Sequence, residues 1–207
     1  MGYSVFWSLS GKLARLGLVS TALAASLAFV NGTSAHELRP AIADVTVASD
    51  SVTVAVELAL EAFVAEIDVS VYENTDEAPN AERYDVLRAM PPAEIEVELR
   101  GAWDRLAPNF LLRAGDAPLV AEITGVDIPD VGDMDLVRDT VLTVTAALPD
   151  DGSDVTVGWT ANNGPLVIRH IGAGDAAYSG LLDGGQVSEP LPRSESGGGF
   201  FRFLFGE

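Results

Sequence analysis

Cysteine is missing from the sequence, and lysine and histidine are scarce. Without cysteine the protein can form neither disulfides nor thiolate metal sites, and it cannot use a thiol as a nucleophile. Lysine occurs once, at Lys12, and histidine twice, at His36 and His170. Beyond residue 30 no apolar run reaches the roughly 20 residues that a membrane-spanning helix needs.

Positive charge is also scarce. The chain has 12 basic residues against 31 acidic ones, a formal net charge of −19. This acidic composition argues against nucleic acid as a partner, because phosphates are bound by basic side chains. It also argues against docking on anionic lipid through a polybasic patch.

Recognisable enzyme motifs are absent as well. The sequence contains no G-x-S-x-G, no H-E-x-x-H and no phosphate-cradling G-x-x-x-x-G-K. Carboxylates are too numerous to single out a pair for acid–base chemistry. We therefore expect a protein that is not an enzyme and has no catalytic or cofactor-binding residues.

Residues 1–35 have the composition of a secretory signal peptide. Lys12 and Arg15 precede an apolar run, residues 16–30, and small and polar residues lead to Ala35. Cleavage after Ala35 would make His36 the first mature residue; the alternative is an uncleaved amino-terminal anchor. We expect an exported, periplasmic protein.

The remainder, residues 36–193, has the pattern of one β-rich domain. Short apolar stretches with strand character are separated by turn signals about every ten residues, at 41–47, 52–60, 110–113, 119–126, 140–148, 155–159, 166–171 and 178–182. Residues 61–71 are too densely apolar to assign, and 74–80 are expected to form an exposed loop. This pattern predicts a mainly β fold, an antiparallel immunoglobulin-like sandwich.

A helical hairpin is expected within the strands, at 81–90 and 92–106. In its second helix Ile95, Leu99, Trp103 and Leu106 fall on one face. Such a stripe is typical of core packing, and a ligand groove is the alternative.

Two features of the sequence suggest metal sites. An amino-terminal His36 offers an amine and an imidazole nitrogen, and His170 would complete a three-nitrogen set suited to Cu(II). The acidic loop 127–139 suggests calcium, but it lacks the D-x-D-x-D-G order, and a solvated acidic loop is favoured. Copper through His36 and His170 is therefore the metal prediction.

Four stretches resemble the exported amino-terminal domain of the HupE/UreJ-type membrane proteins. They are His36–Ala41, Leu58–Ala62, Tyr84–Arg88 and Gly164–Arg169. None of them is a catalytic signature. The resemblance implies a non-catalytic periplasmic domain with a binding or partner-contact role, linked to metal uptake; a soluble Cu(II)-binding protein is the alternative.

Residues 194–207 combine a glycine-rich linker with an aromatic tail, Phe200–Phe205. In the HupE/UreJ-type family an aromatic stretch of this kind often leads into a membrane domain, whose first helix carries His and Asp. That helix is not part of this chain, so permease activity does not carry over. We expect either a truncated chain, whose full-length form is tethered at the inner membrane, or a stand-alone domain. The expected partner is a membrane protein or a membrane segment.

Overall fold

The computed structural model describes residues 39–72, 74–134, 136–172, 174 and 178–194. The predicted signal peptide, His36 and the aromatic tail lie outside these ranges. Within them, no helix has both the length and the apolar character to span a bilayer.

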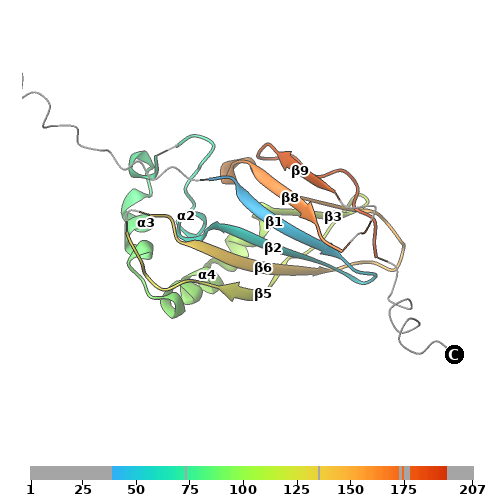
Figure 1. Ribbon diagram of the computed structural model, residues 1–207, viewed down its shortest axis with the longest axis horizontal. Coiled ribbons are helices and arrows are strands. Elements are labelled where there is room, and N and C mark those ends of the chain that lie inside the picture. Colours follow the sequence, from blue (N-terminus) through green and yellow to red (C-terminus); the bar gives the residue numbers. More distant parts are fainter. Residues whose placement is uncertain (1–38, 73, 135, 173, 175–177, 195–207) are drawn as a thin grey trace, which may run out of the picture. The chain divides into compact units, whose positions relative to one another are not determined.

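Nine strands of the described residues form two β-sheets (Figure 1). The larger sheet has the strand order β5 (Glu122–Asp127), β6 (Asp139–Ala147), β2 (Ser51–Ala59), β1 (Ala41–Val47), β8 (Leu166–His170) and β9 (Ser179–Leu182). The smaller has the order β4 (Ala117–Pro118), β3 (Phe110–Ala114) and β7 (Val155–Trp159). The mainly β prediction is confirmed.

One strand pair differs from the predicted antiparallel arrangement. The strands β1 and β8 pair in parallel, with Ala41 opposite Leu166 and Val45 opposite His170. A short turn can join only antiparallel neighbours, whereas strands far apart in the sequence can pair in either direction. Because a long stretch of chain connects these two strands, local turn signals carried no information about their pairing.

Alternating burial explains why these segments form strands. In β2, Val52, Val54, Val56 and Leu58 are buried, and the residues between them are not. Strands β1, β3 and β6 alternate in the same way, as side chains on successive strand residues point to opposite faces. The buried side chains of both sheets belong to one hydrophobic core.

The helices gather at one end of the sheets (Figure 1). Both helices of the predicted hairpin are confirmed, as α3 (Ala81–Arg88) and α4 (Pro92–Leu106). A further short helix, α2 (Leu60–Val64), lies in the unassigned region, and all five of its residues are buried. Two more turns are the 3-10 helices η3 (Ala107–Asn109) and η4 (Ala161–Asn163).

The expectation of an exposed loop at 74–80 was wrong in part. Residues Thr75–Glu77 form a 3-10 helix, η2, in which Thr75 is fully buried. The side chain of Asn74 accepts a hydrogen bond from the Asp76 amide and caps this turn. The polar composition of the segment therefore reflects capping as well as exposure.

The predicted stripe on α4 divides between core and surface. Ile95, Leu99 and Leu106 are fully buried, as expected for core packing. Trp103 is only partly buried and lines a surface groove. The core interpretation is confirmed for the three buried residues, whereas the ligand-groove alternative stays a prediction for Trp103.

Replacement by alanine should have opposite effects on stability at two glycines. Beside β7, the chain passes so close to Gly158 that a β-carbon would collide with the carbonyl oxygen of Gln186. Gly101 lies within α4, where a β-carbon would meet nothing within 4 Å. We expect Gly158→Ala to lower the free energy of unfolding by about 1–3 kcal/mol, and Gly101→Ala to raise it by about 0.5–1 kcal/mol.

Urea unfolding followed by circular dichroism measures both changes. A Gly158→Ala variant as stable as the parent would show that residues 186–188 do not pack against β7 as described.

Candidate functional site

His170, one of the two predicted copper ligands, is the last residue of β8. Its side chain is only 5% exposed, and its backbone N–H donates a 2.7 Å hydrogen bond to the carbonyl oxygen of Tyr178. The other ligand, His36, lies outside the described residues. No group of three or more His, Asp or Glu side chains within the described ranges could hold a metal ion. The copper prediction remains untested.

The burial of His170 determines how copper binding should be examined. Replacing a buried side chain perturbs packing, so lost binding in a His170 variant would not identify a ligand. A change at His36, or an extension that blocks its amine, tests the same site and leaves the buried His170 side chain in place.

A buried ionic network joins the helical end to the large sheet. The carboxylate of Glu61, on α2, is 1% exposed and accepts a 2.7 Å hydrogen bond from Nε of Arg138. The Nη1 of Arg88, on α3, lies 3.6 Å from the same oxygen, Oε1. Both arginines are also buried. Burying two guanidinium groups with one carboxylate requires further acceptors.

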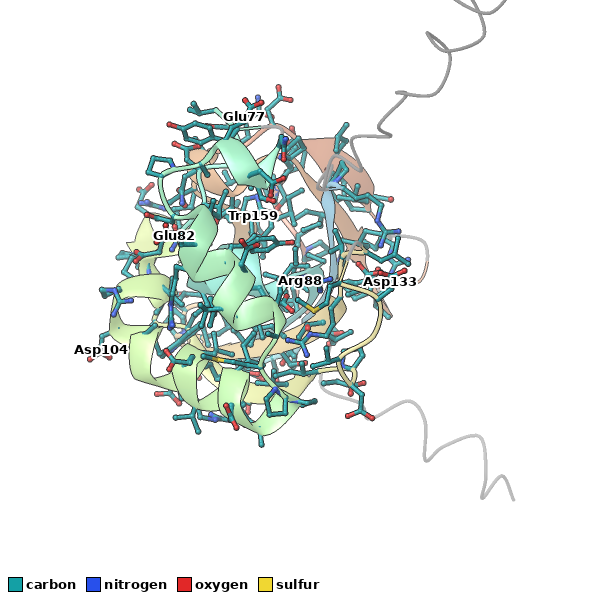
Figure 2. All side chains as sticks on the ribbon, turned by 90° about the vertical axis from the view of Figure 1, so that its left-hand side faces the viewer. Glu77, Glu82, Arg88, Asp104, Asp133 and Trp159 are labelled. Carbon is teal, nitrogen blue, oxygen red and sulfur yellow. The ribbon has the colours of Figure 1, made fainter. Side chains whose placement is uncertain are left out.

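Backbone carbonyl groups supply these acceptors. Arg88 donates to the carbonyl oxygens of Asp133, Met134 and Leu136, and Arg138 donates to those of Met90 and Pro129. Figure 2 shows Arg88 beside the loop that carries Asp133. Hydrogen bonds to its backbone therefore hold the acidic loop against the domain.

The same contacts bear on the calcium alternative for this loop. Calcium loops use backbone carbonyl oxygens along with carboxylates as ligands. Here four carbonyl groups between Pro129 and Leu136 already accept hydrogen bonds from arginine. This arrangement favours the interpretation of a solvated acidic loop.

Tyr84 extends the network toward η2. It is 1% exposed, and burial is the main cause that raises the pKa of its phenol above the usual 10; the nearby Arg88 partly offsets the effect. The neutral phenol is thus the form that suits the folded protein.

An apolar groove of about 630 Å³ lies on another side of the domain, where the end of α4, η3, β3 and the segment 118–122 meet. Its apolar lining includes Trp103, Phe110, Leu111, Leu119, Val120 and Val187. Val120 is 78% exposed and Val187 39%. The volume falls in the range of pockets that hold ligands or partner side chains.

The walls of this apolar groove are held by hydrogen bonds. The indole N–H of Trp103 donates to the carbonyl oxygen of Ala121 at 3.2 Å, and the Leu119 amide donates to that of Leu112 at 2.9 Å. Two acidic side chains, Asp104 and Glu122, also line the groove. Figure 2 shows Asp104 on the opposite side of the helical end from Asp133.

Neither feature was identified from the sequence. Glu61, Arg88 and Arg138 are distant in sequence, and their only signal is that each is a charged residue next to apolar ones. The only sequence signal near the groove was the apolar stripe that contains Trp103, for which a ligand groove was the less favoured interpretation.

Comparisons with known proteins add no identification. A scan against protein-family models gave no match, and a search of curated proteins found no similar sequence. The resemblance to HupE/UreJ-type domains therefore stays a prediction.

The buried network predicts a large loss of stability when the Glu61 carboxylate is removed. In Glu61→Ala two buried arginines lose their counter-charge, and we expect the free energy of unfolding to fall by about 3–5 kcal/mol. Glu96 is the matched control, since it forms an exposed pair with Arg100 one helical turn away. Glu96→Ala should cost less than about 0.5 kcal/mol.

Chemical denaturation of both variants gives the comparison. Equal losses would contradict a stabilising role for the Glu61 carboxylate.

Tyr84 predicts a decline in stability at alkaline pH. Because the folded state raises its pKa, its contribution is complete below the unfolded pKa of about 10 and is lost as pH rises through the folded value. We expect Tyr84→Phe to remove this part of the decline above about pH 10. Tyr178→Phe, at a less buried tyrosine, should leave the decline as it is. A Tyr84→Phe protein with the parent's alkaline decline would refute the assignment.

Proposed function

We propose that this protein is a non-catalytic exported domain that contacts a membrane protein or a membrane segment through its apolar groove. The groove carries the proposal. Isolated exposed apolar side chains are ordinary, but a groove lined by Trp103, Leu111 and Val120 collects them in one concave place. Partner contact is a common use of such a surface.

The resemblance to HupE/UreJ-type proteins supports the membrane context. It implies export to the periplasm, tethering at the inner membrane and a link to metal uptake. Two of the stretches that carry it, Leu58–Ala62 and Tyr84–Arg88, meet in the fold, because Arg88 lies 3.6 Å from Glu61. These residues build the scaffold rather than the groove.

We also propose that the two sheets form an immunoglobulin-like sandwich. The support is the alternating burial of the strands and the single core they share. The parallel pair β1–β8 and the helices at one end are departures from the simplest form of that fold.

Site-specific photocrosslinking in the exporting cell tests the contact. With p-benzoylphenylalanine in place of Val120, we expect adducts with a protein in the membrane fraction. Val97 is the control position, because it is 69% exposed on α4 and does not line the groove. Substitution at Val97 should give no such adduct.

Equal adducts from both positions, or none from Val120, would contradict the proposal. Mass spectrometry of the adduct identifies what lies in the groove.

A further inference from the structure

The end of the chain supplies a candidate occupant for the apolar groove. Residues 200–205 read Phe-Phe-Arg-Phe-Leu-Phe, which gives five large apolar side chains and one arginine. No other stretch beyond the described domain has so many apolar side chains next to a glycine-rich linker. Apolar side chains of this size match a groove lined by Trp103, Phe110 and Val120.

Chain connectivity allows the segment to reach the groove. Val187 lines the groove and Ser194 follows seven residues later, so at most about 25 Å separates them. Leu204 follows Ser194 by ten residues, which span up to about 35 Å when extended. The intervening sequence, Ser196–Gly199, has the glycine content that lets a chain reverse direction.

The charges of the groove and of residues 200–205 are also complementary. Asp104 and Glu122 line the groove, and the segment carries Arg202 as its one charged residue. Arg113, the basic residue of the lining, already donates a 2.5 Å hydrogen bond to the carbonyl oxygen of Asp116. An apolar segment with a single arginine therefore meets a complementary rim.

From this match we propose that residues 200–205 of this chain occupy its own apolar groove. The inference rests on the groove of the proposed function and names the segment that fills this groove when no membrane partner is bound. A tethered segment has an effective concentration in the millimolar range, so weak contacts are sufficient for it to stay bound. Where the same segment leads toward a membrane, its docking fixes how the domain is held above that membrane.

Because the chain has no cysteine, disulfide trapping provides a direct test. In the purified full chain, Val120→Cys combined with Leu204→Cys should form an intramolecular disulfide under mild oxidation. The control pairs Val97→Cys with Leu204→Cys. Val97 is as accessible as Val120 and lies about 9 Å from Trp103 along α4.

We expect the Val120 pair to oxidise at least about tenfold faster than the Val97 pair, measured by loss of free thiol and by intact mass. Equal rates, no disulfide, or disulfides only between two chains would overturn the proposal. Val97 and Val120 are both exposed, so their replacement should be tolerated. Thermal unfolding of the reduced variants verifies that the fold is kept.

The outcome is separable from that of the proposed function. Disulfide trapping uses purified protein without any membrane, whereas the photocrosslinking experiment reports contacts in the cell. A failed intramolecular disulfide together with a membrane adduct at position 120 would reject the tail and retain the groove.

Discussion

The carboxylate of Glu61 is the group on which the helical end of the domain depends. It lies in the five-residue helix α2, with essentially no solvent exposure, and it faces guanidinium groups from α3 and from the residue before β6. Buried ion pairs tolerate little error in geometry, since each partner loses its hydration. The three elements are therefore constrained together: α2, α3 and the start of β6 cannot shift separately without leaving a charge unpaired.

This constraint also explains why the acidic loop has a defined course. Acidic loops usually lie on the surface, with their backbone in solvent. Here, arginine side chains from the interior donate hydrogen bonds to the carbonyl groups of the loop. Carbonyl groups bonded in this way fix the backbone, while the side chains of Asp127, Asp130 and Asp133 stay exposed. The surplus of positive charge inside is accompanied by negative charge in the loop outside.

Much of the fold could be predicted from local patterns, and little of the site could. Short apolar stretches between turn signals located β2 and β6 within one or two residues, and the spacing of Ile95, Leu99 and Leu106 located α4. Those signals are local, as burial repeats along each element. The pairing of β1 with β8, the meeting of Glu61 with Arg138 and the walls of the groove depend on segments brought together by folding. No periodicity in the sequence predicts these contacts. Helix α2 could not be predicted either, because a helix that is apolar on all sides shows no amphipathic period.

The central place of β1 has a consequence for the order in which the domain is completed. It is the first strand of the described residues, yet it lies between β2 and β8, and β8 is followed by only one more of the described strands. The hairpin of β1 and β2 can form early, but one edge of β1 stays open until residue 166 and those after it are present. Such long-range pairing slows folding and leaves a strand edge exposed meanwhile. A chain that is exported unfolded would thus reach its stable form only after nearly all of it has crossed the membrane.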